Sequence, residues 1–167
     1  MALLFLHGAG GYAEDRPLAD AIAAEIGESV DYPRFSAEDM AYTHQADTMR
    51  AALDALGPND LVAAHSFGAS VLLRVLAERA RPVPRRVVLL AMPDWSADGW
   101  DVAEYEFTGP PPLQQVSLHH CRDDAVVEFA HLALAAALLP DAAMHAHDAG
   151  GHQFDGLAPV IARDLRA

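Results

Sequence analysis

Short apolar runs alternate along the chain with longer segments whose apolar positions repeat at helical spacing. The runs are rich in Val and Leu, which is typical of strands buried on both faces of a parallel sheet. Six strands are predicted, at residues 3–6, 29–32, 61–64, 86–91, 115–120 and 143–147. Five helices are predicted, at residues 16–26, 37–56, 66–78, 126–138 and 157–165. This alternation predicts an α/β fold in which helices cover both faces of a mostly parallel sheet.

The connection over residues 92–113 has no clear helical pattern. It carries four aromatic residues among acidic ones and ends in a glycine followed by three prolines. The aromatic residues are Trp95, Trp100, Tyr105 and Phe107. A long aromatic loop can line a substrate pocket or simply cover one end of the sheet, and the sequence favours neither.

Length and composition narrow the range of functions. A chain of 167 residues fits one domain, so we expect residues 1–167 to form a single unit. The net charge is −13 and lysine is absent, which argues against nucleic-acid binding and against an anionic membrane surface. No apolar run approaches the roughly 18 residues that span a bilayer. The first six residues are predicted to form a strand and not a signal peptide.

Cys121 is the only cysteine, which excludes an internal disulfide and a thiolate cluster. A reducing compartment agrees with this, and we expect a cytoplasmic protein. His119, His120 and Cys121 are adjacent on a predicted strand, where successive side chains point to opposite faces, so they cannot close one metal site together. We expect no metal and no cofactor.

The apolar run at residues 61–64 stops at a serine that is flanked by small residues and followed by a helical segment. This pattern predicts a nucleophile elbow, a tight strand-to-helix turn that exposes the hydroxyl of Ser66. Gly68 fills the second small position. Ala64 stands where the G-x-S-x-G pattern has its first glycine, so the match is one methyl group short.

Four segments that carry candidate catalytic residues each follow a predicted strand. They are His7 to Gly11, Ser66, Arg122 to Asp124, and Asp148 to His152. In an open parallel sheet, ligands bind at the carboxyl ends of the strands, so these segments are expected to meet. Their order is glycine-rich loop, serine, acid and histidine, which is the chain order of serine hydrolases on this type of sheet.

On these residues the chain resembles the α/β-hydrolase superfamily, and within it the small serine hydrolases without a cap domain. The resemblance covers nearly the whole chain. It implies a minimal three-layer α/β/α sandwich with strand order 2-1-3-4-5-6. The first and third strands would then lie side by side, so the His7 loop and Ser66 would open into one crevice.

The resemblance implies a catalytic triad of Ser66, His152 and Asp124. The glycines before His152 resemble the family's histidine loop, and His145 and His147 on the preceding strand are its rivals. Residues 120–127 resemble the family segment H-G-x-x-D-x-x-V-P, which selects Asp124. The adjacent Asp123 and the more distant Asp148 remain alternatives for the acid.

The same resemblance places the oxyanion hole at the backbone amides of Ala9 and Phe67. His7, Trp95 and Trp100 are expected to contact substrate. The loop that begins at His7 could also be an ordinary tight turn. Nucleotide binding is disfavoured because the chain lacks the P-loop lysine and because Ala13 breaks the G-x-G-x-x-G spacing.

The expected activity is hydrolysis of a carboxylic ester or thioester of a small to medium substrate through an acyl-enzyme on Ser66. Amide or peptide hydrolysis by the same triad is the first alternative. A non-catalytic domain that binds a ligand or partner is the second, and loss of a triad residue would favour it. The only expected partner is a small-molecule substrate, and the sequence does not determine the oligomeric state.

Overall fold

Six parallel strands form one sheet in the computed structural model, which describes residues 1–79 and 84–167. The strand order is β2-β1-β3-β4-β5-β6, and every neighbouring pair is parallel, which confirms the predicted order. The strands are β1 (Ala2–Leu6), β2 (Ser29–Asp31), β3 (Leu61–His65), β4 (Arg86–Leu90), β5 (Gln115–Cys121) and β6 (Ala143–His147).

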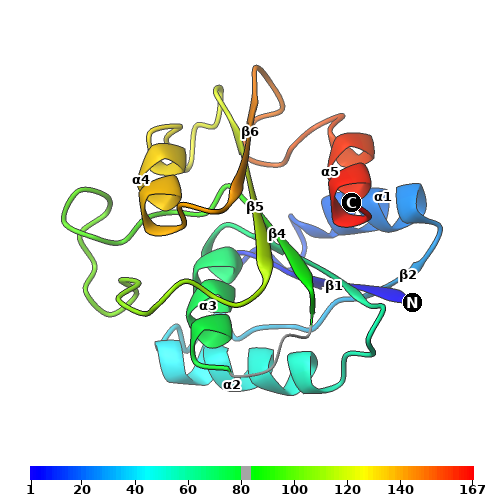
Figure 1. Cartoon of the computed structure of the whole chain (residues 1–167), viewed down its shortest axis with the longest axis horizontal. Coiled ribbons are helices and arrows are strands. Elements are labelled where there is room, and N and C mark those ends of the chain that lie inside the picture. The colour runs from blue at the N-terminus through cyan, green and yellow to red at the C-terminus, as the bar shows by residue number, and fades with distance from the viewer. Residues whose placement is uncertain (80–83) are drawn as a thin grey trace.

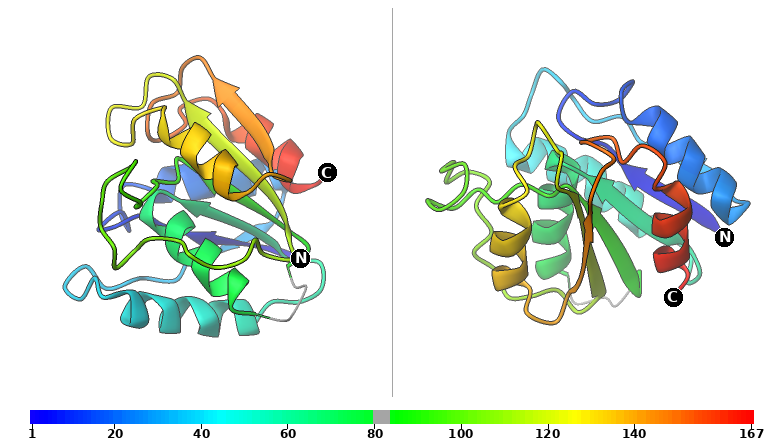
Figure 2. Two further views of the ribbon diagram at one scale, coloured as in Figure 1. Left: turned by 60° about the vertical axis from the view of Figure 1, so that its left-hand side comes forward. Right: turned by 90° about the horizontal axis from the view of Figure 1, so that it is seen from above.

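Helices cover both faces of this sheet, as predicted (Figure 1). One face carries α1 (Arg16–Ile26) and α5 (Ala158–Leu165). The other carries α2 (Tyr42–Asp54), α3 (Phe67–Ala77) and α4 (His131–Leu138). Figure 2 shows the sheet between these two helical layers. Within the described ranges, none of the helices is long and apolar enough to cross a membrane.

Alternating residues of each central strand are buried in different cores. In β1, Leu3 and Phe5 pack toward α1 and α5, whereas Leu4 and Leu6 pack toward α2 and α3. All four are at most 1% exposed, and burying each contributes about 1.5–3 kcal/mol. Because every neighbouring pair of strands is parallel, the carboxyl ends of all six strands lie at one end of the sheet.

Two helices begin about five residues later than the sequence pattern predicts. Before α2, the Ser36 hydroxyl accepts hydrogen bonds from the N–H groups of Glu38 and Asp39. Before α4, Oδ1 of Asp124 accepts hydrogen bonds from the N–H groups of Val126 and Val127. These side-chain oxygens bind backbone N–H groups in a local turn that competes with a helical turn. The two helices therefore start after them.

Candidate active site

Ser66 lies at the sharp turn from β3 to α3. Its backbone has φ 52° and ψ −125°, a conformation that L-residues rarely adopt and that costs about 1–3 kcal/mol. Its N–H donates to the carbonyl of Leu90 at 2.8 Å, which ties the turn to the neighbouring strand. The turn therefore has the backbone geometry of a nucleophile elbow.

The two small positions around Ser66 serve different purposes. A Cβ atom on Gly68 would lie 2.4 Å from the carbonyl oxygen of His7, so only glycine fits there. The methyl group of Ala64 is fully buried in the core between the sheet and α3. The elbow thus accommodates alanine at the first small position and requires glycine at the second.

His152 and Asp124 form a hydrogen-bonded pair in which His152 is partly exposed. Nδ1 of His152 lies 2.8 Å from Oδ2 of Asp124, whose side chain is fully buried. Burial by itself would raise the pKa of Asp124, but the hydrogen bonds from His152, Val126 and Val127 outweigh it and hold the pKa below its usual value. Asp124 is therefore an ionised carboxylate at neutral pH that can orient the ring of His152.

The alternative acids take other positions. Both carboxylate oxygens of Asp123 accept hydrogen bonds from the N–H groups of Gly150 and Gly151, at 3.2 and 2.9 Å. Asp123 therefore anchors the loop that carries His152. The Asp148 side chain is fully exposed and lies 3.5 Å from Arg122. The structure pairs only Asp124, among these three carboxylates, with His152.

A cavity of about 400 Å³ lies at the carboxyl ends of β1 and β3. It brings together most of the predicted site residues, with Asp124 behind His152. Trp95 and Trp100 form part of its wall, and their rings meet edge to face with centroids 5.0 Å apart. The cavity is lined by Gly8, Ala9, Gly10, Gly11, Glu14, Asp15, His65, Ser66, Phe67, Trp95, Trp100, Val126, His152 and Gln153.

The aromatic connection over residues 92–113 serves both purposes considered from the sequence. Trp95 and Trp100 line the cavity, whereas Tyr105 and Phe107 pack on the core beside α3. Trp95 is fixed by a hydrogen bond of 2.8 Å from its indole N–H to the hydroxyl of Ser70.

His7 does not line the cavity, contrary to the expectation that it contacts substrate. Its ring is buried, with Nδ1 2.7 Å from the carbonyl oxygen of Gly8, and Nε2 accepts a hydrogen bond from the N–H of Phe35 at 3.1 Å. These contacts place the proton on Nδ1, and burial lowers the pKa of the ring, so His7 is neutral. His7 instead fixes the peptide group at the start of the glycine-rich loop.

Sequence reasoning missed Asp15, a buried carboxylate that connects three segments of the site. Its Oδ2 accepts a hydrogen bond from the N–H of Gly8 and lies 2.7 Å from Nδ1 of His65, while Oδ1 accepts one from the amide of Gln153. Nε2 of His65 in turn lies 2.8 Å from the backbone carbonyl of His152. Asp15 thus holds the glycine-rich loop, the elbow and the histidine loop together.

No local sequence signal marks Asp15, because its partners come from residues 7 to 138 positions away. The acid precedes α1 without capping it, so it resembles an ordinary turn residue in the sequence. Burial raises its pKa, but the hydrogen bond from His65 and those from Gly8 and Gln153 lower the pKa below its usual value overall.

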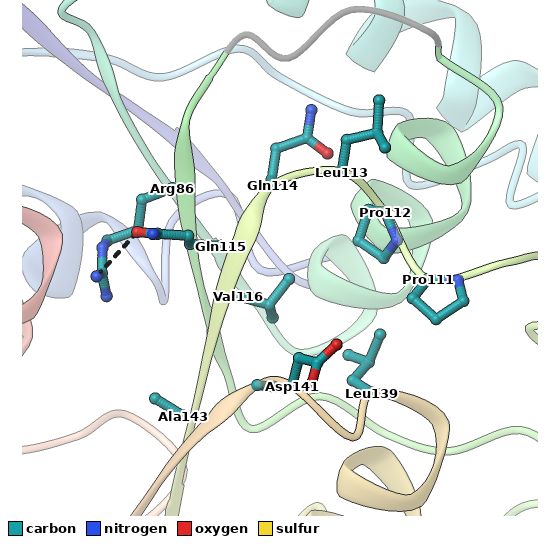
Figure 3. Close-up of a pocket in the computed structure, with 11 residues that line it drawn as sticks. Arg86, Pro111, Pro112, Leu113, Gln114, Gln115, Val116, Leu139, Asp141 and Ala143 are labelled. Carbon is teal, nitrogen blue, oxygen red and sulfur yellow. Dashed lines mark hydrogen bonds between the residues drawn. The ribbon is translucent and has the colours of Figure 1, made fainter.

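A second cavity of about 400 Å³ lies at the opposite end of the sheet, where β4, β5 and β6 begin (Figure 3). Its walls come from residues 111–116 and from the turn before β6, with Arg86 at one side. Its lining includes none of Ser66, Asp124 and His152. The first cavity is therefore the candidate active site.

No protein-family model matches the chain, and no curated protein matches it in sequence. Solved structures do match it. The ydeN gene product of B. subtilis has 19% identity and a TM-score of 0.76, with 99% of this chain and 96% of that chain covered. Alpha/beta hydrolase domain-containing protein 10 from mouse has 12% identity and a TM-score of 0.73, with 99% and 88% covered. This chain has the α/β-hydrolase fold.

Est1E from Butyrivibrio proteoclasticus, solved with ferulic acid bound, shares the α/β-hydrolase fold with this chain at 14% identity and a TM-score of 0.74. That match covers 99% of this chain and 86% of Est1E. The fold predicted from the sequence resemblance, a six-stranded α/β hydrolase without a cap domain, is confirmed.

Replacing Ser66 by glycine is expected to give a more stable protein than replacing it by alanine. Both variants lose the hydroxyl, but glycine adopts the positive φ without the steric cost. Urea unfolding should give Ser66→Gly a free energy of unfolding about 1 kcal/mol higher than that of Ser66→Ala. An alanine variant of equal or greater stability would contradict strain at this position.

Asp15→Asn is expected to lower the free energy of unfolding at pH 7 by about 1–3 kcal/mol, because buried hydrogen-bond partners lose their carboxylate. Since the folded-state pKa of Asp15 is lowered, its stabilisation is present above about pH 4 and is lost as the pH falls further. Unfolding measured at pH 7 and pH 3 should show the difference from wild type shrinking. Asp20→Asn, at an exposed position of α1, should change the free energy of unfolding little.

Proposed function

We propose that the chain is a serine hydrolase that cleaves a carboxylic ester or thioester of a small to medium substrate through an acyl-enzyme on Ser66. One observation carries the proposal. Ser66, in its positive-φ turn, lines the same cavity as His152, whose Nδ1 is bonded to the buried carboxylate of Asp124. This is the set of groups that activates a hydroxyl whose own pKa makes it a weak nucleophile.

In the proposed reaction, the Ser66 hydroxyl attacks the substrate carbonyl while His152 accepts its proton at Nε2. His152 then gives this proton to the leaving alcohol or thiol, and an acyl-enzyme remains. Water attacks the acyl group by the same route and restores the serine. Asp124 holds the proton on Nδ1 of His152 and stabilises the imidazolium that forms at each step.

The oxyanion hole is proposed at the N–H groups of Phe67 and Ala9. Phe67 is the first residue of α3, where an N–H has no partner within the helix. Ala9 lies on the glycine-rich loop, and both residues line the cavity. In the described ranges, neither N–H donates to a protein acceptor. Each donor aimed at a developing oxyanion contributes about 10²- to 10³-fold to the rate.

The cavity supports a substrate of limited size and low negative charge. A volume of about 400 Å³ lies toward the small end of the range for small-molecule sites. Trp95, Trp100 and Val126 offer apolar surface, whereas Glu14 and Asp15 add negative charge to the wall. A neutral ester or thioester with a short to medium acyl group fits this lining better than a polyanion.

Ser66→Ala is expected to abolish covalent labelling by a fluorophosphonate probe, because the probe reacts only with an activated hydroxyl. The variant should also lose hydrolysis of p-nitrophenyl acetate and butyrate. Gel fluorescence and absorbance at 400 nm measure the two effects. Undiminished labelling would contradict Ser66 as nucleophile, and absence of both activities in the wild type would favour a binding domain.

Asp124→Asn is expected to lower kcat by about 10²- to 10⁴-fold, because an amide cannot fix the required tautomer of His152. Asp123→Asn is the matched control, since its remaining carbonyl oxygen still accepts one of the two loop N–H groups. Steady-state kinetics on p-nitrophenyl butyrate should show a much smaller loss for this variant. The reverse order would move the acid to position 123.

A further inference from the structure

Three histidines and one aspartate gather on the face of the sheet covered by α5. His119 of β5 and His145 of β6 are direct partners in the parallel register, and His147 follows two residues later on the same face. Asp164 approaches from α5, which covers this face of the sheet (Figure 1). None of the four side chains lines the candidate active site.

Three ligand atoms of this cluster converge. Nε2 of His119 lies 3.0 Å from Oδ2 of Asp164, and Nε2 of His145 lies 3.8 Å from the same oxygen. All three atoms lie within 4.8 Å of one another, and in the described part of the chain no other three His, Cys, Asp or Glu side chains meet this spacing. The rings of His119 and His145 are stacked, with centroids 4.3 Å apart.

An ion-pair network explains only part of this arrangement. Arg86 donates to Oδ1 of Asp164 at 3.0 Å, and His119 contacts Oδ2, so these three groups satisfy one another. His145 is different, because its Nε2 is buried and has no hydrogen-bond partner among the described residues. An unpaired buried nitrogen costs free energy that a ligand would recover.

We propose that His119, His145 and Asp164 bind a divalent transition-metal ion of the zinc class. Two imidazole nitrogens and a carboxylate oxygen form a ligand set that suits Zn²⁺, Co²⁺ or Ni²⁺. Tetrahedral bonds of about 2.0–2.2 Å require ligand atoms roughly 3.3–3.5 Å apart and an ion in the plane of each imidazole ring. His145 must therefore move inward and rotate out of its stack on His119 to complete the triangle. A water molecule would occupy the fourth position.

The surrounding groups orient these ligands. Nδ1 of His119 lies 3.0 Å from Nε2 of His147, so His119 can donate its remaining ring proton there while Nε2 binds the metal. Arg86 occupies Oδ1 of Asp164 and leaves Oδ2 for the ion. Arg86 also donates to the hydroxyl of Ser117 on β5, so the guanidinium links the carboxylate of Asp164 to the sheet.

The bound ion would fasten α5 to the edge strand β6. His145 is the best residue to change, because its side chain is 37% exposed and its Nε2 makes no hydrogen bond to the described residues. The proposed ester hydrolysis does not require this site, so metal binding is measured directly and not through activity.

The test is titration of chelator-treated protein with ZnCl₂ in a calorimeter, together with thermal unfolding. Wild type should bind one Zn²⁺ per chain, and its Tm should rise by several degrees at a 100-fold excess over Kd. His145→Ala should lose at least tenfold in affinity. His44→Ala, at an exposed histidine on α2, and His152→Ala should both keep wild-type affinity.

Three results would overturn the proposal. They are absence of stoichiometric binding by wild type, undiminished binding by a folded His145→Ala variant, and loss of binding in His152→Ala alone. The last result would place the ion at the candidate active site. Circular dichroism of each variant establishes that it is folded.

Discussion

Parallel hydrogen bonding between neighbouring strands is the constraint on which the rest of the structure depends. It directs the carboxyl ends of all six strands to one end of the sheet, and the apolar residues on both faces of the central strands bury the sheet between two helical layers. With β1 beside β3, the glycine-rich loop and the elbow share one cavity. The loops after β5 and β6 bring Asp124 and His152 together beside that cavity.

The rigid sheet also makes a strained serine possible. The positive φ of Ser66 costs free energy, and the close approach of Gly68 to the carbonyl of His7 leaves the turn no room to relax. Asp15 then joins the loops around it through a buried carboxylate. Local strain and buried polar groups are thus concentrated where the proposed chemistry takes place.

Apolar periodicity predicted the strands and the grouping of chemical residues at their carboxyl ends, whereas the strand order came from the resemblance to the α/β-hydrolase superfamily. The sequence did not predict Asp15, whose partners are distant in sequence, or the buried position of His7. It also considered His119 only with its chain neighbours, whereas the register places His145 beside it. Contacts between separate strands have no local signal, so such pairs emerge only from the folded structure.

The proposed catalytic roles require that the cavity stabilises a developing oxyanion by hydrogen bonds. A crystal structure of the protein after reaction with a phosphonate ester shows directly which residue is modified and which N–H groups contact the phosphoryl oxygen. We expect phosphorus bonded to Oγ of Ser66, with the phosphoryl oxygen within about 3.1 Å of the N–H groups of Ala9 and Phe67. His152 should lie on the leaving-group side. Phosphorus on another residue, or a phosphoryl oxygen turned away from both N–H groups, would contradict it.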